Sequence, residues 1–556
     1  MKQTQVVVIG AGLGGLSTAV HLAGAGYGVT VYDRQSGPGG KAFSERVGRY
    51  RFDTGPSLFT LKRVFDELFS TVGRNFDDYV SARPLDPICS YFWSDGTRLA
   101  ARGNEDRLAR EFGRVMAADG DTEGDADVKG ITDQVTAFLR YSARIYDITA
   151  ELFLERSLHD WRTYASGRFW KSLVQFPWID PFRTMERATG SFFADPRIRQ
   201  FFNRYATYNG SDPYRTPATL NIIPHVEYGI GAWEIDGGIY TIPQAIETVA
   251  RELGVSFHYD TPVTRIIRDR SVGGRVTGIE VDGTIIPAAV VISNVDVTVT
   301  YRDLLEDVAA PLFRRYGKLE PSSSGIVFYW GMNRQFPELG LHNVFFSDNY
   351  RTEFEELFQR YRTPSDPTIY INITSKTSGQ VHRDAPEGCE NWFVLVNAPA
   401  DFGQDWNEEV RKVRGRIVSR LNRLLGRDVG AAIEVESVLT PPEIAERTGS
   451  YRGSLYGIAS NTRLAAFLRH PNRSRRHRGL YLVGGSAHPG GGMPLVVLGG
   501  KITAGLVQRD IPPGDVPPGD IPPGDIPPGV SSPGNRLSPP KGLFPPGRPP
   551  KLRRST

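Results

Sequence analysis

The sequence predicts an α/β protein with a Rossmann-like lobe and a second lobe of mixed α+β structure, and three observations support this fold class. The first forty residues follow a strand–turn–helix–strand pattern around a run of glycines. Short runs rich in Val and Ile return between about 228 and 296 and again at 479–485. At 556 residues the chain is too long for one small core, so a second lobe is required.

The elements of the Rossmann-like lobe follow in order from apolar runs and the residues that interrupt them. "VVVIG" at 6–10 predicts a buried strand, "LSTAVHLAGAG" at 16–26 a helix closed by Gly26, and "GVTVYD" at 28–33 a second strand. Further strands are expected in "VSFHYDTPVTRIIRD", "RVTGIEVDG", "AAVVISNVD" and "GLYLVGG". The run "PLVVLGGKITAGLVQR" at 494–509 predicts a last helix, despite its pair of glycines.

Composition narrows the classes of function. A content of 40% hydrophobic and 23% charged residues is typical of globular proteins, and a net charge of +4 does not indicate a nucleic-acid binder. Only two cysteines occur, Cys89 and Cys389, which argues against a disulfide framework or a metal site and fits a reducing compartment. No apolar run approaches the ~20 residues that cross a bilayer. The first residues predict a strand rather than a signal peptide, so a cytoplasmic protein is expected.

The composition changes abruptly after Asp510. The segment "IPPGDVPPGDIPPGDIPPG" repeats every five residues, and the chain stays rich in proline to its end. Proline removes hydrogen-bond donors and fixes φ, so 511–556 is expected to be a disordered Pro/Gly-rich tail. The last part of this tail is basic, which leaves two interpretations: a solvated segment, or a contact with a membrane or partner.

A nucleotide site is predicted near the N-terminus. "GAGLGG" places Gly10, Gly12 and Gly15 in the spacing G-x-G-x-x-G, directly after a strand and at the start of a helix. The first glycine makes a tight turn, the second lets backbone approach a pyrophosphate, and the third lets helix and strand pack closely. Asp33 ends the next strand, where a carboxylate can bond the ribose hydroxyls. These contexts together favour a nucleotide site over a glycine-rich structural turn.

The residues after Asp33 indicate which nucleotide is bound. "DRQSGPGGKAF" brings Gly39, Gly40 and Lys41 directly after the acid, and "FDTGPS" then supplies Gly55. This extension looks like the flavin version of the fingerprint, in which the chain returns to cover the pyrophosphate. No second full G-x-G-x-x-G is evident, so one site that holds FAD is expected, without a separate NAD site. Lys41 either belongs to that cover or is a solvated surface lysine.

Seven motifs in order over 1–510 resemble the bacterial phytoene-desaturase family of FAD-dependent carotenoid oxidoreductases. They are "VVVIGAGLGGLSTAVHLAGAGYGVTVYD", "GPGGKAF", "FDTGPS", "RYATYNGSDPYRTPA", "HVEYGIGAWEIDGGIYTIPQAI", "VVISNVD" and "GLYLVGGSAHPGGGMPLVVLGGKI". Within this family, "ENWFVLVNAPADFGQDW" and "HPGGGMPLVVLGGKI" look most like the 1-hydroxycarotenoid 3,4-desaturases. The tail after 510 has no counterpart in the family pattern.

The resemblance implies a GR2-type flavoprotein fold whose FAD site is assembled from both ends of the chain. The FAD-binding domain would comprise 1–80, 225–300 and 475–510, and the substrate- and membrane-facing domain 81–224 and 301–474. The glycines 490–492 would lie against the isoalloxazine ring, at the N-terminus of a helix that favours the negative charge of the reduced flavin. A simple hinge is the alternative interpretation of these glycines.

The resemblance also implies individual FAD contacts. Many relatives carry Gly-Asp after the last strand, whereas this chain has Gly484-Gly485-Ser486, so no acid is assigned there. Gly237 and Gly238 would complete the FAD cradle, and Asn294 is either a contact or the cap of a turn. The full set of expected contacts is Gly10, Gly12, Gly14, Gly15, Asp33, Arg34, Gly39, Gly40, Lys41, Gly55, Val263, Asn294, Gly484, Gly485, Gly492, Met493 and Pro494.

The implied reaction introduces a C-3,4 double bond into a 1-hydroxylated carotenoid of the rhodopin or 1'-hydroxy-gamma-carotene type. The C–H bonds involved are not acidic, so hydride transfer to the flavin precedes loss of a proton, and the protein mainly positions the reactants. Glu227 is the candidate acceptor of that proton, with a structural ion pair as the alternative. Arg204 either steers the hydroxylated end or pairs with an acid. The electrons would pass on to a quinone or to oxygen.

Aromatic residues are dense between 161 and 208 and alternate with basic ones. This segment is interpreted as a membrane contact or substrate tunnel, with a plain aromatic core as the alternative. At ~0.8 kcal/mol per buried CH₂, a carotenoid of roughly forty carbons cannot diffuse freely through water. Peripheral binding to the inner face of the cell membrane is therefore expected.

Four other functions remain open. Two share the cofactor: a phytoene desaturase that makes several double bonds, and a carotenoid ketolase. A third is a non-enzymatic lipid carrier of the GDP-dissociation-inhibitor type, against which the FAD motifs at both chain ends argue. The fourth, an amine oxidase, would need a polar cage for an amine that the sequence does not indicate.

Overall fold

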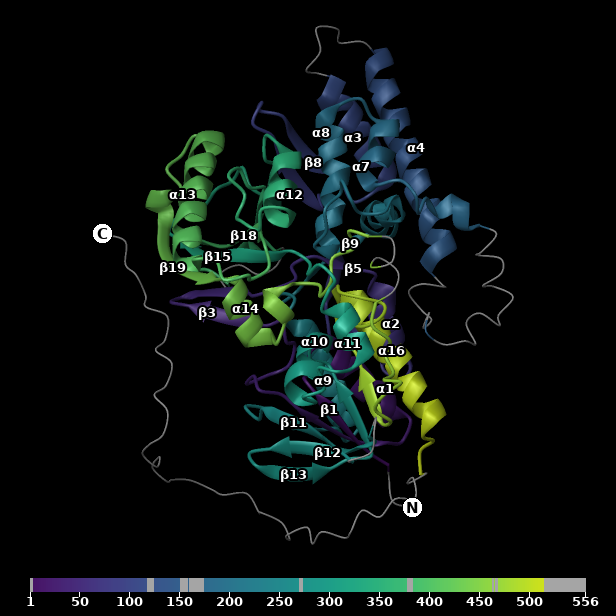
Figure 1. The fold of residues 1–556 in the computed structure, drawn as a ribbon. Coiled ribbons are helices and arrows are strands. Elements are labelled where there is room, and N and C mark those ends of the chain that lie inside the picture. The colour runs from purple at the N-terminus through teal and green to yellow at the C-terminus, as the bar shows by residue number, and fades with distance from the viewer. Residues whose placement is uncertain are drawn as a thin grey trace.

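The computed structural model describes residues 4–117, 125–150, 159, 175–269, 274–377, 384–462, 465 and 469–514. Figure 1 shows two sheet-based layers, with a group of helices (α3, α4, α7 and α8) standing at the top of the molecule. The lower part is built around β1 and α1 from the start of the chain and α16 from the end of the described chain. The predicted α/β fold is therefore confirmed.

A parallel sheet of five strands forms the core of the lower lobe, in the order β10-β2-β1-β14-β20. Ile9 pairs with both Tyr32 and Ser293, and Ser293 pairs with Leu482, so these strands end together at one edge. The predicted strands of this lobe are confirmed. Their bounds are β1 Gln5–Ile9, β2 Gly28–Tyr32, β10 Ser256–His258, β14 Val290–Ser293 and β20 Leu480–Leu482.

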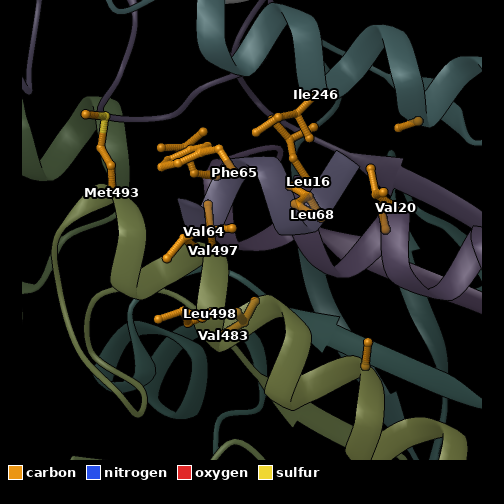
Figure 2. Close-up of a cluster of buried hydrophobic side chains, with 14 of the residues drawn as sticks. Leu16, Val20, Val64, Phe65, Leu68, Ile246, Val483, Met493, Val497 and Leu498 are labelled. Atoms are coloured by element: carbon orange, nitrogen blue, oxygen red, sulfur yellow. The ribbon is translucent and has the colours of Figure 1, made fainter. Parts of the chain in front are cut away.

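Four helices, including one from each end of the described chain, form the apolar layer on one face of this sheet. They are α1 (Leu13–Gly24), α2 (Lys62–Ser70), α9 (Thr241–Glu252) and α16 (Met493–Asp510). Figure 2 shows Leu16 of α1 and Val497 of α16 within one cluster of buried side chains, with Phe65 and Met493 beside them. Ser17 Oγ donates to the carbonyl of Val497 over 2.8 Å, so α1 and α16 are in direct contact.

An antiparallel sheet lies against the other face of the parallel sheet. It contains β11 (Val263–Arg268), β12 (Val276–Val281) and β13 (Thr284–Pro287), and the side chains between the two sheets are buried. The sequence indicated the first two of these strands but not β13. That strand is short, largely exposed and ends at a proline, so it carries little apolar signal.

The second lobe is built on a sheet of seven strands in the order β19-β15-β18-β17-β16-β7-β8. Helix α13 (Trp406–Leu425) covers one face through a shared apolar core, and all nine residues of β15 are buried. The sequence predicted a mixed lobe here without locating these strands. Their bounds are β7 Cys89–Phe92, β8 Arg98–Ala101, β15 Ser324–Met332, β16 His342–Phe345, β17 Ile369–Asn372, β18 Glu390–Ala398 and β19 Ile433–Leu439.

The remaining strands and helices connect and cap the two large sheets. Two small sheets consist of β3 (Ser44–Val47) with β4 (Tyr50–Asp53), and of β5 (Phe59–Thr60), β9 (Ala232–Ile235) and β6 (Ala82–Pro84). The helices at the top are α3 (Glu105–Ala117), α4 (Asp125–Thr149), α7 (Met185–Phe192) and α8 (Pro196–Asn203). The others are α10 (Val297–Val299), α11 (Pro311–Tyr316), α12 (Tyr350–Phe358) and α14 (Pro441–Thr448).

The aromatic segment 161–208 divides into two environments where it is described. Phe193, Phe201 and Phe202 are buried in a core shared with α3 and α4, as the alternative interpretation expected. Trp178 and Phe182, in contrast, are 61% and 62% exposed. The residues at 160–174, and 515–556 of the proposed tail 511–556, lie outside the described part of the chain.

No helix in the described ranges has both the length and the apolar character needed to cross a bilayer. The two large sheets draw their strands from different parts of the chain. The strands of the five-stranded sheet come from within 1–80, 225–300 and 475–510, and those of the seven-stranded sheet from within 81–224 and 301–474. The division into an FAD domain and a substrate domain therefore stands as a proposal that matches the two sheets.

Candidate active site

One cavity of about 1070 Å³ extends from the carboxyl ends of the parallel strands to one face of the seven-stranded sheet. Ligands of open α/β sheets bind at this edge, where successive strands end. Of the residues expected to contact FAD, all line this cavity except Gly15, Gly237, Gly238 and Gly490, and Arg204 and Glu227 line it as well. Gly237 and Gly238 do not line it: a Cβ on Gly238 would lie 2.4 Å from Oδ2 of Asp53, so this glycine packs on the buried Arg51–Asp53 pair instead.

Asp33 stands at the end of β2 with its carboxylate held by backbone. Ala11 N donates to Oδ2 over 2.6 Å and Gln35 N donates to Oδ1 over 2.8 Å. Burial raises the pKa of Asp33, while these two N–H groups act in the opposite direction. The side chain is fixed at the edge of the cavity, as a carboxylate that binds ribose hydroxyls must be.

Asn294 fills the centre of the glycine loop. Its Nδ2 donates to the carbonyl of Gly10 over 3.4 Å. A Cβ on Gly12 would lie 2.5 Å from Nδ2, and a Cβ on Gly14 or Gly484 would lie 2.9 Å from Oδ1. These glycines therefore let the amide of Asn294 approach the backbone of both chain ends. The structure shows Asn294 bridging the β1–α1 turn and the end of β20.

The chain after Asp33 returns over the first glycine loop, as the flavin fingerprint predicted. Gly39 forms a bridge with Gly12, and a Cβ on Gly40 would lie 3.3 Å from Cα of Gly12. Lys41 Nζ donates to the carbonyls of Leu455 (2.7 Å) and Ser454 (3.3 Å). Burial lowers the pKa of Lys41 to about 8, although nearby Asp296 raises it. Lys41 is therefore a partly buried group of the cavity wall and not a solvated surface lysine.

The glycines 490–492 form an ordered turn before α16. Gly492 caps the helix with φ +114°, a conformation that glycine adopts without strain, and Met493 and Pro494 follow at the cavity wall. A Cβ on Gly491 would lie 2.8 Å from Cδ1 of Tyr456. The same tyrosine ring contacts the turn at Gly210, where a Cβ would lie 2.9 Å from Cδ2. Tyr456 thus joins the glycine turn to the segment that follows Arg204.

These features test whether an FAD molecule fits. Glycines leave the backbone bare around Asn294, the carboxylate of Asp33 stands at the cavity edge, and the N-terminus of α16 opens on the same cavity. A dinucleotide needs a bare glycine loop for its pyrophosphate, an acid for its ribose and a long cavity for its two ends. The residues present therefore fit FAD, held by both ends of the chain.

The far wall of the cavity is one face of the seven-stranded sheet. Tyr91, Val344, Tyr370, Leu395 and Val327 are successive cross-strand partners on five neighbouring strands. Side chains alternate between the two faces of a strand, so these partners share one face. On β18 the cavity is lined by every second residue: Phe393, Leu395 and Asn397. This wall was not predicted, although the alternation within "ENWFVLVNA" was a signal for it.

A buried polar cluster forms the adjoining wall. Glu227 accepts hydrogen bonds from the hydroxyls of Tyr208 (2.6 Å to Oε2) and Tyr205 (3.0 Å to Oε1). Arg204 Nη2 donates to the hydroxyl of Tyr91 over 2.7 Å and lies 3.7 Å from Oε1 of Glu227. Burial raises the pKa of Tyr208 well above its ordinary value, and Glu227 raises it further. Tyr208 therefore stays a neutral hydroxyl that donates to the carboxylate.

Both candidate catalytic residues lie in this cluster. Glu227 is 1% exposed and Arg204 is 8% exposed, so each depends on the other for charge compensation. The ion pair expected as the alternative role of each residue is present. Because both side chains also line the cavity, a role toward a ligand is compatible with that ion pair.

Three further polar residues of the wall were missed by sequence analysis. Ser57, Tyr370 and His342 line the cavity and form a chain of hydrogen bonds. They come from the loop after β4 and from strands β17 and β16. Ser57 belongs to the motif "FDTGPS", so its proximity to Gly55 was visible in the sequence. Its partners were not, because they lie about three hundred positions away.

Glu353 lies behind this wall and gives a first testable prediction. Its Oε2 accepts from Ser347 Oγ (2.8 Å) and Thr368 Oγ1 (2.7 Å), and burial raises its pKa from 4.5 to about 7. Its contribution to stability is therefore complete below pH 4.5 and is lost as pH rises through about 7. We expect Glu353→Gln to leave the melting temperature unchanged at pH 5 and to raise it by about 2 °C or more at pH 8. An equal gain at both pH values would contradict the assignment.

Comparisons with known proteins agree with this geometry. The sequence model of flavin containing amine oxidoreductases matches residues 13–508. A 1-hydroxycarotenoid 3,4-desaturase of Flavobacterium sp. (strain P99-3) is 42% identical over 90% of this chain and 99% of its own length. A zeta-carotene-forming phytoene desaturase of Myxococcus xanthus is 34% identical, over 90% and 92%. A putrescine oxidase structure shares the fold, with a TM-score of 0.59 and 14% identity over 91% and 99% of the chains.

Proposed function

Because the chain belongs to the flavin-containing amine oxidoreductase family and to its phytoene-desaturase group, we propose that it introduces the C-3,4 double bond into a 1-hydroxylated carotenoid. It is an FAD-dependent oxidoreductase. The substrate would be acyclic or monocyclic, of the rhodopin or 1'-hydroxy-gamma-carotene type. The observation that carries the proposal is the cavity, in which the FAD cradle meets a wall formed by β18.

The residues of β18 support the choice of substrate. "ENWFVLVNAPADFGQDW" is the motif that most resembles the 1-hydroxycarotenoid 3,4-desaturases, and its alternate residues Phe393, Leu395 and Asn397 face the cavity. Phe393 and Leu395 offer apolar surface to a polyene, and Asn397 adds a polar group beside them. A largely apolar cavity with a few placed polar groups is typical of a site for such a ligand.

The contribution of the protein to desaturation is mainly placement of the substrate. FAD, when bound, supplies the acceptor for the hydride. The apolar wall holds the polyene and excludes water, and the bare glycine turn at 490–492 leaves room for close approach. The polar cluster then receives the proton lost from the neighbouring carbon. Tyr208 can take this proton as it passes its own to Glu227 across 2.6 Å, with Arg204 orienting the carboxylate.

Product analysis tests the proposal. Cells that express the full chain are supplied with a 1-hydroxylated lycopene-type carotenoid or with its unhydroxylated parent, and the pigments are separated by chromatography. We expect one additional double bond in the hydroxylated substrate and little product from the parent. Several successive double bonds in a colourless precursor would instead indicate a phytoene desaturase, and an oxygenated product a ketolase.

Two alternative functions remain, a non-enzymatic lipid carrier and an amine oxidase. A purified protein with bound flavin excludes the non-enzymatic carrier, because that interpretation has no role for FAD. Putrescine oxidase shares only the fold with this chain, so its amine substrate gives no support to an amine oxidase here. The reduced flavin would be reoxidised by a quinone or by oxygen. The rate of flavin reoxidation, measured with each acceptor separately, would distinguish the two.

Peripheral binding to the inner face of the membrane is part of the proposal. Trp178 and Phe182 expose apolar rings beside the basic residues Arg144 and Arg183, and the Arg144 guanidinium lies 5.9 Å from the Trp178 ring centre. Exposed aromatic rings next to cationic side chains suit the boundary between lipid head groups and acyl chains. Such docking would let a carotenoid pass from lipid to the cavity without entering water.

We therefore expect the double variant Trp178→Ala/Phe182→Ala to bind carotenoid-loaded liposomes at least about 100-fold more weakly, since each buried ring contributes roughly 1.5–3 kcal/mol and every 1.4 kcal/mol corresponds to about tenfold. Co-sedimentation with the liposomes measures this. Ile285→Ala is the matched control, because Ile285 is 58% exposed on β13, at the opposite end of the molecule from α4 (Figure 1). Equal liposome binding by the double variant and the wild type would refute this docking surface.

A further inference from the structure

A chain of three hydrogen-bonded groups on the cavity wall has no part in the chemistry described above. Ser57 Oγ lies 2.6 Å from the hydroxyl of Tyr370, which lies 2.7 Å from Nδ1 of His342. All three residues line the cavity. The polar atoms of this chain are therefore placed where a ligand can reach them.

The direction of the hydrogen bonds follows from Asn372. Its Nδ2 donates to the carbonyl of Leu341 over 3.1 Å, which fixes the amide, and the same nitrogen lies 3.2 Å from Nδ1 of His342. Nδ1 is therefore an acceptor. Burial lowers the pKa of His342 to about 3, so the ring is neutral. Tyr370 consequently donates to His342, and Ser57 donates to Tyr370.

This direction determines what the chain offers to a ligand. The hydroxyl hydrogen of Ser57 is donated to Tyr370, and that of Tyr370 is donated to His342. Ser57 and Tyr370 therefore present only oxygen lone pairs to the cavity. The ligand group must therefore be a hydrogen-bond donor. The positive charge of Arg204 acts on His342, which disfavours a cation at this place. A carboxylate has no hydrogen to donate. A neutral hydroxyl satisfies all three conditions.

We propose that Ser57 and Tyr370, oriented by His342, bind the tertiary hydroxyl of the carotenoid and make the enzyme selective for hydroxylated substrates. This rests on the proposed function. Ser57 is two residues from Gly55 of the FAD cradle, and the hydroxyl oxygen is three bonds from C-3 and four from C-4, at most roughly 5 Å away. A hydroxyl held at Ser57 keeps those carbons beside the cofactor. An unhydroxylated end leaves the lone pairs without a partner, which a site built for a hydroxyl penalises strongly.

The test measures selectivity in two ways. Wild type, Ser57→Ala and Tyr370→Phe, each loaded with FAD, are given the 1-hydroxylated carotenoid or its parent in phosphatidylcholine liposomes, and the ratio of the two kcat/KM values is determined. Binding of both carotenoids is then titrated by tryptophan quenching with the anaerobic, dithionite-reduced enzyme, which cannot accept a hydride. Tyr27→Phe is the matched control, because it loses a 2.7 Å hydrogen bond to Ile511 outside the cavity.

We expect Ser57→Ala to lower both ratios by about tenfold or more, Tyr370→Phe to lower them by about three- to tenfold, and Tyr27→Phe to leave them unchanged. The inference is overturned if the first two variants keep the wild-type ratios, if Tyr27→Phe lowers them equally, or if the wild type shows no preference. If the wild-type protein desaturates neither carotenoid, the proposed function is refuted instead. The binding ratio then still decides whether the hydroxyl site exists.

Discussion

Replacing Gly15 with alanine is expected to yield a protein that is purified without its yellow cofactor. A Cβ at this position would lie 2.1 Å from the carbonyl oxygen of Gly10, which is backbone and cannot rotate away. Relief requires α1 to move away from β1, and the glycine loop between them is the proposed site of the dinucleotide. Overpacking costs about 1–3 kcal/mol, which corresponds to roughly 10- to 100-fold in FAD affinity. Flavin absorbance of the purified protein and an FAD titration measure this loss.

The matched control is Gly415→Ala, in the exposed face of α13. An added Cβ there meets no atom within 4 Å. Alanine is the better helix former, so this variant should be more stable by up to about 1 kcal/mol and keep its flavin. Full flavin content in the Gly15 variant would show that the β1–α1 turn is not the cofactor site.

The parts of the fold that sequence analysis predicted depend on local signals. The β1–α1–β2 unit combines an apolar strand, a fixed glycine spacing and an acid at the next strand end within about thirty residues. Each signal is confined to one segment, and each segment has the predicted structure. The same holds for the turn before α16, whose glycines and proline stand together in the sequence.

The wall of the cavity could not be predicted in this way. Tyr91, Val344 and Tyr370 become neighbours only through pairing of β7, β16 and β17, and about 250 residues separate β7 from β16 in the chain. Pairing between distant strands depends on burial of the whole sheet and leaves no local pattern. Hydrogen bonds such as that between Ser57 and Tyr370 follow from this pairing. The polar residues of the substrate site could therefore be identified only from the structure.

The pair Gly237-Gly238 shows the converse error. Sequence analysis placed this pair, which follows β9, in the FAD cradle. In the structure Gly238 instead leaves room for the ion pair between Arg51 and Asp53. Asp53 Oδ2 accepts from the backbone of Ile239 over 2.7 Å, and Arg51 holds the other oxygen of that carboxylate at the same distance. A side chain on Gly238 would displace this buried carboxylate. Glycine indicates close approach of some group, and the sequence does not say whether that group is ligand or protein.

Replacing Glu227 with glutamine is expected to lower turnover by about 10²- to 10⁴-fold while FAD stays bound, the range typical of a lost proton acceptor. Glutamine matches the shape of the carboxylate and can still accept a hydrogen bond from Tyr208, but it cannot take up a proton. Because Glu227 is 1% exposed and accepts from two tyrosines, the proton reaches it through the cavity-lining hydroxyl of Tyr208. Phenylalanine at Tyr208 should therefore slow turnover as well, whereas Tyr205, which does not line the cavity, should tolerate this change.

Glu353→Gln separates the catalytic from the structural interpretation of Glu227. Glu353 is also a buried carboxyl that accepts two hydroxyl hydrogen bonds, but it does not line the cavity. Turnover of hydroxylated carotenoid, flavin absorbance and melting temperature are measured for both variants at pH 7.5. If Glu227 is the proton acceptor, only its variant loses turnover at unchanged flavin content. Wild-type turnover by Glu227→Gln with FAD bound would leave Glu227 as the structural partner of Arg204 and would require another group to receive the proton.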